Sequence, residues 1–240
     1  MSNKLSVIIP TYNEAENIKL LCSEIFHAFS EAEIIIVDDN SPDGTAEIAQ
    51  KIPGTKVIVR TSERGLGSAI LAGIRAATTP VICIIDADLS HPPEAIPKMY
   101  QLIEEGKAAL VVGSRKVSGG GTSEWIWYRK IIHSVARWLG SFLTPIQDIT
   151  SGFFMFKKEI IKGVKLEPRS WKIGLEIMVK GKYDQAVEYP IVFVEREAGK
   201  SKMGYREVLA YLGHLVSLTM YKFQEPASKP TCRQARHRGS

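Results

Sequence analysis

Cysteine is scarce in this chain of 240 residues, which has only Cys22, Cys83 and Cys232. The number is odd, and no CxxC pair or Cys/His cluster is present, so the sequence indicates neither a disulfide framework nor a structural zinc site. Few and unclustered thiols are typical of proteins from a reducing compartment. We therefore expect a cytoplasmic protein whose cysteines are not cross-linked.

Long apolar runs and a secretion signal are missing as well. No stretch reaches the roughly 18 uninterrupted apolar residues of a membrane-spanning helix. The first apolar run, residues 5–9, is too short for a signal peptide, and Glu14 and Glu16 follow it closely. We therefore expect no membrane-spanning segment in this sequence.

Neither sign of charge dominates. The 31 Lys and Arg residues exceed the 26 Asp and Glu residues by 5, and residues 224–240 supply +3 of this excess, from four basic residues less Glu225. A nucleic-acid-binding protein would spread a basic face over its folded body, so we expect no nucleic-acid partner. The alternative, binding through the basic tail, predicts affinity that disappears when residues 224–240 are removed and that falls steeply with salt.

Short apolar runs alternate with segments of helical period. The apolar runs predict strands buried on both faces at residues 5–9, 34–37, 57–59, 81–85 and 109–112. The segments between them predict helices at residues 14–29, 45–52, 67–77 and 93–105. This alternation is typical of an α/β protein with a mostly parallel, Rossmann-like sheet and helices on both faces.

The second half of the chain predicts further elements of both kinds. They are an aromatic and basic helical stretch at residues 123–143, a strand at 152–156, a helix at 171–180, a strand at 186–194 and a helix at 205–223. No linker interrupts this pattern before residue 224, where Pro, Ser, Gln and Arg become frequent. We therefore predict one domain over residues 1–223 and a disordered basic tail over residues 224–240.

Acidic side chains directly follow the apolar run at residues 81–85. Ligands of an open parallel sheet bind beyond the carboxyl ends of its strands, and Asp86 and Asp88 point to the same side of an extended chain. A divalent cation would relieve their repulsion, and Mg²⁺ typically takes one or two carboxylates together with phosphates and water. The pattern favours a metal and nucleoside-diphosphate site. The alternatives are that Asp88 caps the next helix or that both carboxylates are solvated.

A second acidic pair, Asp38 and Asp39, follows the run at residues 34–37. Asp39 is placed to accept hydrogen bonds from a base or a ribose, with Asp38 as a weaker candidate. Turn and capping roles are expected for Asn40, Asp43 and Thr45.

Glycines near residue 70 could be mistaken for a dinucleotide-binding fingerprint. Gly65, Gly67 and Gly73 have the wrong spacing and follow the third predicted strand instead of the first. We predict that they allow close packing of a helix.

Six motifs occur in order along the chain. They are Pro10-Thr-Tyr-Asn-Glu14, Asp38-Asp-Asn-Ser-Pro-Asp-Gly-Thr45, Asp86-Ala-Asp-Leu-Ser-His-Pro92, Val112-Gly-Ser-Arg115, Arg115-Lys-Val-Ser-Gly-Gly120 and Arg196-Glu-Ala-Gly-Lys-Ser-Lys202. Over about positions 5–223 this set resembles the dolichol-phosphate mannose synthase branch of the family 2 glycosyltransferases. The resemblance implies a GT-A fold and an inverting enzyme that moves mannose from GDP-mannose to dolichyl or polyprenyl phosphate with Mg²⁺ or Mn²⁺.

The resemblance also implies site residues. Its nucleotide-sugar contacts carry over onto Pro10, Tyr12, Glu14, Val37, Asp39, Asp86, Ala87, Asp88, Arg115, Arg196 and Lys202. Its metal ligands carry over onto Asp86 and Asp88, whereas Ser90 stands where some members have Gln and would act through its hydroxyl or a water. Many members have an acceptor-phosphate Ser where this chain has His133, so His133 and Ser134 stay alternatives for that contact.

The chemistry of such a transfer requires no general base. A phosphate monoester has a second pKa near 6, so its attacking oxygen is already largely anionic at neutral pH. The site has to align this oxygen and to stabilise the departing diphosphate. We expect Asp88, Arg115 and Arg129 as catalytic residues, with both arginines gripping the acceptor phosphate. Arg196 and Lys202 would lie on a glycine-containing loop that closes over the substrate.

A lipid acceptor would place the site near a bilayer. Residues 124–142 mix Trp, Tyr and basic side chains as interfacial helices do, although packing on the domain is the alternative for this segment and for residues 205–223. We expect a peripheral protein on the cytoplasmic face of a membrane, with a membrane-anchoring partner subunit as in some members. A polyprenyl-phosphate glucosyltransferase using UDP-glucose and a non-catalytic nucleotide-sugar or phospholipid binding module stay open. So do the roles of His91 and His133.

Overall fold

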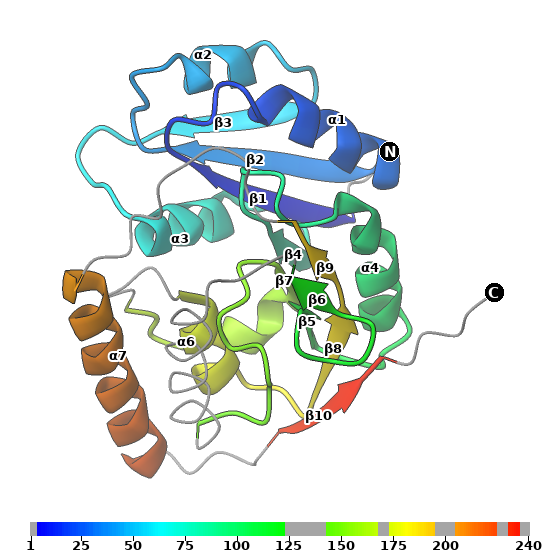
Figure 1. Cartoon of the computed structure of the whole chain (residues 1–240), viewed down its shortest axis with the longest axis vertical. Coiled ribbons are helices and arrows are strands. Elements are labelled where there is room, and N and C mark those ends of the chain that lie inside the picture. Colours follow the sequence, from blue (N-terminus) through cyan, green and yellow to red (C-terminus); the bar gives the residue numbers. More distant parts are fainter. Residues whose placement is uncertain (1–3, 123–142, 168–172, 195–204, 225–229, 236–240) are drawn as a thin grey trace.

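The fold begins as a regular alternation of strands and helices (Figure 1). The computed structural model describes residues 4–122, 143–167, 173–194, 205–224 and 230–235. The first half contains β1 (Leu5–Thr11), α1 (Ile18–Ala28), β2 (Ala32–Asp38), α2 (Thr45–Gln50), β3 (Thr55–Val59), α3 (Leu66–Ala76), β4 (Val81–Ile84), a 3₁₀ turn (Pro93–Ala95), α4 (Ile96–Glu104) and β5 (Leu110–Ser114). The second half contains β6 (Gly121–Thr122), β7 (Phe154–Lys157), a 3₁₀ turn (Lys158–Ile161), α6 (Ile173–Lys180), β8 (Gln185–Pro190), β9 (Val192–Phe193), α7 (Tyr205–Gln224) and β10 (Thr231–Gln234).

One large sheet organises the molecule, in the strand order β10-β8-β5-β7-β4-β1-β2-β3. All its pairs are parallel except those of β7, which runs antiparallel between β4 and β5. Every residue of β1, β4 and β5 is buried, which explains why their sequences are mostly apolar. The predicted mostly parallel α/β sheet is confirmed.

The sheet carries a hydrophobic core on each face. Successive residues of β1 point to opposite sides, so Ile8 packs in the core with α3, α6 and α7, whereas Val7 and Ile9 pack in the core with α1, α2 and α4. Helices therefore cover both faces, as the sequence predicted (Figure 1). Among the residues described, no helix has the length and apolar character needed to cross a membrane.

Two predicted elements differ in detail. The helix predicted at 14–29 begins at Ile18, because the chain first makes a turn in which Asn13 has φ 60 and the Asn17 N–H donates to the Glu14 carbonyl. The strand predicted at 186–194 divides into β8 and β9, because the chain changes its partner there: β8 pairs with β5 up to Pro190, and β9 pairs with β6 from Val192. The helical stretch predicted at 123–143 lies outside the described residues except for Leu143.

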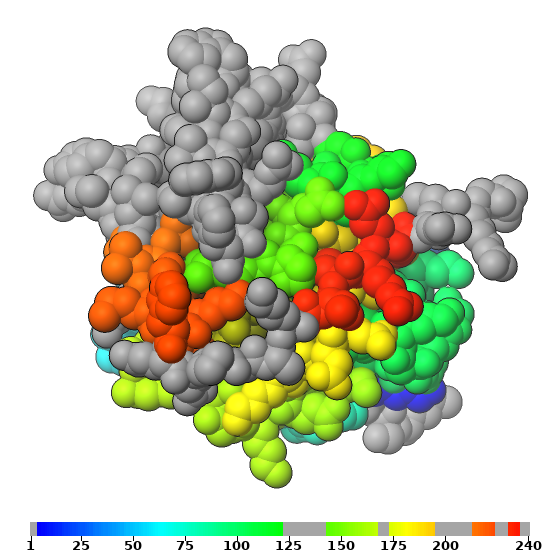
Figure 2. All heavy atoms as spheres, turned by 90° about the horizontal axis from the view of Figure 1, so that it is seen from below, coloured from blue at the N-terminus to red at the C-terminus, as the bar shows by residue number. Residues whose placement is uncertain are grey.

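The C-terminal tail also differs from its prediction. Thr231–Gln234 forms β10 and pairs in parallel with β8, with Cys232 opposite Ala186. Figure 2 shows this strand in red on the surface of the molecule. Disorder was therefore the wrong prediction for this stretch. The edge of β8 offers unpaired N–H and C=O groups to any neighbouring chain, and the composition of the tail carries no sign of that edge.

At Gly73, α3 packs closely against the sheet. A Cβ at this position would sit 2.4 Å from Cγ2 of Ile8 on β1, which agrees with the predicted close packing. We expect Gly73→Ala to lower the free energy of unfolding by about 1–3 kcal/mol, because overpacking outweighs the gain in helix propensity of about 1 kcal/mol. Urea denaturation measures the change.

Gly213 in α7 provides a matched control, because a Cβ there meets no described atom within 4 Å. Gly213→Ala should leave stability unchanged or raise it by up to about 1 kcal/mol. A Gly73→Ala protein as stable as wild type would contradict the close-packing interpretation.

Candidate active site

Acidic and aromatic side chains meet at the carboxyl ends of β1, β2 and β4. A hollow of about 300 Å³ opens there, lined by Pro10, Thr11, Tyr12, Glu14, Asp39, Leu66, Ala69, Asp86, Ala87 and Asp88. Parallel neighbouring strands deliver these residues to one edge of the sheet, where open α/β sheets bind ligands. Seven of the predicted nucleotide-sugar residues therefore line a single hollow: Pro10, Tyr12, Glu14, Asp39, Asp86, Ala87 and Asp88.

Two predicted nucleoside contacts, Val37 and Asp39, have structural roles that the sequence did not predict. Val37 is fully buried in the core, so only its main chain could meet a ligand. The carboxylate of Asp39 is bound by Arg60: Nε donates to Oδ1 at 2.7 Å, and Nη2 donates to the same oxygen. Its Oδ2 accepts the N–H of Gly65 at 2.8 Å. Asp39 therefore ties the loop after β3 to the hollow as well as lining it.

Asp38 has a structural part in the turn that follows β2. Its fully buried carboxylate accepts hydrogen bonds from the Thr11 hydroxyl at 2.8 Å and from the backbone N–H of Ser41 at 2.8 Å. In the same turn Asp43 accepts the N–H of Thr45 at 3.0 Å, as expected of a turn-forming residue. The residue that caps α2 is Gly44 instead of Thr45.

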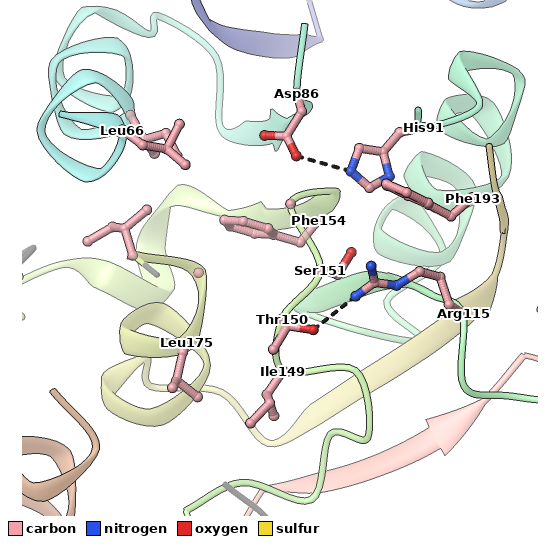
Figure 3. A pocket seen from close by; sticks show the side chains of 14 residues that line it. Leu66, Asp86, His91, Arg115, Ile149, Thr150, Ser151, Phe154, Leu175 and Phe193 are labelled. Atoms are coloured by element: carbon pink, nitrogen blue, oxygen red, sulfur yellow. Dashed lines mark hydrogen bonds and ion pairs between the residues drawn. The ribbon is translucent and has the colours of Figure 1, made fainter. Parts of the chain in front are cut away.

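A second cavity, of about 210 Å³, adjoins the first and shares Asp86 and Leu66 with it (Figure 3). Its walls have two characters. Polar groups on one side come from Asp86, His91, Arg115, Thr150 and Ser151. Apolar groups on the other side come from Leu66, Ile70, Ile149, Phe154, Ile173 and Leu175. Such a cavity suits a ligand with one polar and one apolar end.

Arg115 enters this cavity from the end of β5 and is held by Asp148 (Figure 3 shows its bond to Thr150). Its Nε and Nη2 donate to the two oxygens of Asp148 at 2.8 and 2.7 Å, and Nη2 also donates to the Thr150 hydroxyl at 2.9 Å. Burial by itself would raise the pKa of the Asp148 carboxyl, but the hydrogen bonds and positive charge of Arg115 bring it below its ordinary value. The guanidinium therefore has a fixed orientation.

His91 is a buried residue that contacts the carboxylate of Asp86. Its Nε2 lies 3.2 Å from Oδ2 of Asp86, and its ring packs between those of Phe153 and Phe193 with the side chain 1% exposed. The sequence left the role of His91 open. The geometry makes it a group that orients Asp86.

Gly152 leaves the space that Asp86 occupies. A Cβ at this position would lie 2.1 Å from Oδ2 of Asp86. We expect Gly152→Ala to displace this carboxylate and to lower divalent-metal affinity by about 10–100-fold, as loss of outer-shell support typically does. Titration with Mn²⁺ monitored by electron paramagnetic resonance measures the affinity.

Gly213→Ala again serves as the control for this experiment, because it adds a methyl group on α7 at a residue that lines neither cavity. Unchanged Mn²⁺ affinity in the folded Gly152→Ala protein would contradict the proposed crowding of the carboxylate.

The carboxylates of Asp86 and Asp88 fit a divalent cation. Both line the first hollow, and the side chain of Asp86 is 37% exposed. Among the residues described, no three His, Cys, Asp or Glu side chains cluster for a metal, so phosphates and water would complete the coordination of a cation there. Ser90 is 2% exposed and lines a separate cavity of about 470 Å³. Its backbone N–H donates to Oδ1 of Asp88 at 3.1 Å, and its side chain as a metal ligand stays a prediction.

Some predicted residues fall outside the described part of the chain, and some described residues were not predicted. Outside it lie Arg129, His133, Ser134, Arg196 and Lys202.

The sequence interpretation missed Arg60, Asp148, Thr150, Ser151 and Gly152. The last four lie in residues 148–152, a mostly polar segment that ends one residue short of β7. Because β7 is antiparallel, its amino end lies beside the carboxyl ends of β4 and β5. The sequence does not reveal that β7 is antiparallel, and without this knowledge residues 148–152 could not be assigned to the site.

Comparison with known sequences gives consistent results. The model of the family described as "Glycosyl transferase family 2" matches residues 6–164. The dolichol-phosphate mannosyltransferase of Pyrococcus furiosus is 44% identical over 228 residues, which cover 91% of this chain but only 64% of that relative. The dolichol-phosphate mannosyltransferase of Saccharomyces cerevisiae is 36% identical, covering 93% of this chain and 90% of its own length. The polyprenol monophosphomannose synthase of Mycolicibacterium smegmatis is 38% identical, covering 82% and 80%.

Solved structures resemble the whole architecture. Glucosyl-3-phosphoglycerate synthase from Mycobacterium tuberculosis has a TM-score of 0.66 at 18% identity and covers 94% of this chain and 82% of its own. The mannosyltransferase PcManGT from Pyrobaculum calidifontis, solved with GDP-Man and Mn²⁺, has a TM-score of 0.63 at 21% identity, with 96% and 66% covered. These likenesses concern the fold alone. They confirm the GT-A fold.

Proposed function

Because the chain belongs to glycosyl transferase family 2, we propose that it transfers mannose from GDP-mannose to dolichyl or another polyprenyl phosphate, with inversion at the anomeric carbon. The observation that carries this proposal is the pair of adjoining cavities that share Asp86. One has the carboxylates that a metal and diphosphate require, and the other combines an arginine with an apolar wall. Relatives that are 36–44% identical in sequence bear the names of enzymes with this activity.

The hollow with Asp86 and Asp88 is the proposed donor site. Tyr12, 37% exposed, offers a face for the base, and the Arg64 guanidinium lies 5.4 Å from its ring centroid. Glu14, Pro10 and Ala87 line the same hollow. A divalent cation, Mg²⁺ or Mn²⁺, would be held by the two aspartates and would neutralise the charge that develops on the diphosphate. The other nucleotide-sugar residues proposed are Val37, Asp39, Arg115, Arg196 and Lys202, with Ser90 as a further metal contact.

The cavity that contains Arg115 is the proposed acceptor site. Asp148 and Thr150 hold the guanidinium so that it presents a fixed charge and fixed N–H donors to a phosphate. The apolar wall would contact the first carbons of the lipid. Arg129 and either His133 or Ser134 complete the proposed phosphate contacts.

The residues of the two cavities would act mainly by alignment. The acceptor phosphate carries an anionic oxygen at neutral pH, so no side chain has to remove a proton from it. Arg115 would hold this phosphate beside the donor hollow, while Asp86, oriented by His91, belongs to both cavities. Holding the two reactants together in line supplies a large share of the rate enhancement.

A polyprenyl phosphate resides in a bilayer, so the proposal includes a membrane surface as a partner. We extend it to peripheral attachment on the cytoplasmic face and to a membrane-anchoring subunit. Flotation with vesicles that contain polyprenyl phosphate tests the attachment, and protein that stays at the bottom of the gradient would contradict it.

The experiment for the activity incubates purified protein with radiolabelled GDP- and UDP-sugars, a short polyprenyl phosphate and Mg²⁺ or Mn²⁺. The label that enters the organic phase is counted, with Asp88→Ala as the control. Transfer from GDP-mannose that requires metal and is lost in the control supports the proposal. Transfer from UDP-glucose alone would replace the donor. Nucleotide binding without any lipid product would favour a non-catalytic binding module.

A further inference from the structure

Glu188 is a buried carboxylate outside both cavities. It lies on β8, paired with Val112 of β5, and is 1% exposed. Its Oε2 accepts the backbone N–H of Gln147 at 3.0 Å, and its Oε1 accepts the backbone N–H of Asp148 at 2.9 Å. One side chain therefore holds two consecutive peptide groups of the segment that precedes β7.

That segment determines where Arg115 points. Asp148 accepts the Arg115 backbone N–H at 3.0 Å and two donors from its guanidinium. Arg115 directly follows β5, the strand that pairs with β8, so Glu188 and Arg115 start from neighbouring strands and meet through Asp148. A shift of the peptide at Asp148 would turn the guanidinium within its cavity.

The C-terminal strand β10 pairs with β8 and covers Glu188. Sγ of Cys232 lies 3.9 Å from Oε2 of Glu188, and the N–H of Ala235 donates to the Glu188 carbonyl at 2.9 Å. The strand β10 thus covers the edge of β8 at this carboxylate (Figure 2 shows β10 on the surface). Excluding water strengthens the hydrogen bonds beneath it.

We propose that Glu188 is a positioning residue for the acceptor phosphate. It acts through the backbone of Gln147 and Asp148 and through the Asp148 carboxylate on Arg115. The inference rests on the proposed function insofar as Arg115 contacts the acceptor. A glutamate suits this task because each of its two oxygens receives one N–H. Glutamine would turn an NH₂ group toward one of these donors and lose that hydrogen bond.

Glu188→Gln is the variant that tests the inference, with Glu33→Gln as its matched control. Glu33 is also a strand glutamate that accepts a backbone N–H, from Thr78 at 2.9 Å. It lies near the amino end of β2, whereas the two cavities lie at the carboxyl ends of the parallel strands. Two quantities are measured on the full chain: amide hydrogen exchange of Gln147 and Asp148 by NMR, and KM for each substrate.

We expect Glu188→Gln to speed exchange of one or both amides by about tenfold or more, since a hydrogen bond to a charged group is lost. KM for polyprenyl phosphate should rise about tenfold while KM for GDP-mannose changes less than twofold. In an Arg115→Lys background the same substitution should have less effect on KM, because both changes act on one contact.

Unchanged exchange, an unchanged KM for the acceptor, or an equal rise of that KM in Glu33→Gln would overturn the role of Glu188. The two proposals fail separately. Wild-type protein without mannosyl transfer refutes the proposed function, whereas slow exchange of both amides in Glu188→Gln refutes the positioning role whatever the activity.

Discussion

Replacement of Asp88 by alanine should lower metal-dependent mannosyl transfer by about a thousandfold, or roughly 4 kcal/mol of transition-state stabilisation. Asp88 and Asp86 are the carboxylates of the donor hollow at the end of β4. With one of them absent, a divalent cation and the diphosphate that it neutralises would be held weakly. The radiolabel assay measures the loss.

The variant should remain folded, which separates lost chemistry from lost structure. Asp88 is only partly buried, and its removal takes away one of two neighbouring negative charges. Mn²⁺ should raise the melting temperature of the wild type by mass action but not that of Asp88→Ala. Asp184→Asn, a charge removal at an exposed position away from the described cavities, is the control. Wild-type activity in Asp88→Ala would refute the metal site.

Asp148→Asn should lower the free energy of unfolding by about 3–5 kcal/mol at neutral pH. The side chains of Arg115 and Asp148 are 6% and 1% exposed, and removing one partner of a buried pair leaves an uncompensated charge. Urea unfolding measures the difference. Because both groups belong to one pair, Arg115→Gln/Asp148→Asn should cost less than the sum of the single changes. Additive costs would show that the pair is not coupled.

The effect of Asp148→Asn should depend on pH in a defined direction. Burial of the Asp148 carboxyl would raise its pKa, but the hydrogen bonds and positive charge of Arg115 keep this pKa below the ordinary aspartate value of about 4. A depressed carboxyl pKa gives stability that is fully present above the unfolded pKa and is lost as pH falls through the folded pKa. The gap in stability between wild type and Asp148→Asn should therefore narrow below about pH 4. A gap that widens in acid would contradict this assignment.

Local patterns in the sequence were sufficient for much of the fold and for the donor hollow. Apolar runs with acidic ends placed Asp39, Asp86 and Asp88 directly after their strands, and parallel strands share their carboxyl edge, where the three residues line one hollow. The resemblance of the motifs added the family, which the match over residues 6–164 confirms.

Contacts between distant parts of the chain could not be predicted in this way. Arg115 and Asp148 are 33 positions apart, and no periodicity in the intervening residues indicates that they pair. The four-residue segment Thr231–Gln234 forms a strand because it pairs with the edge of β8. The composition of this segment does not suggest that partner. Secondary structure at such an edge depends on the neighbouring strand more than on the segment itself.

By itself the sequence determined the alternation of strands and helices and the acidic edge at which β1, β2 and β4 end, because side-chain periodicity and hydrophobicity act over short distances. Only the tertiary structure decided the role of each carboxylate: Asp86 and Asp88 line a hollow, whereas Asp148 is bound to Arg115. An ion pair depends on distances in space, and the antiparallel course of β7 brings these side chains together.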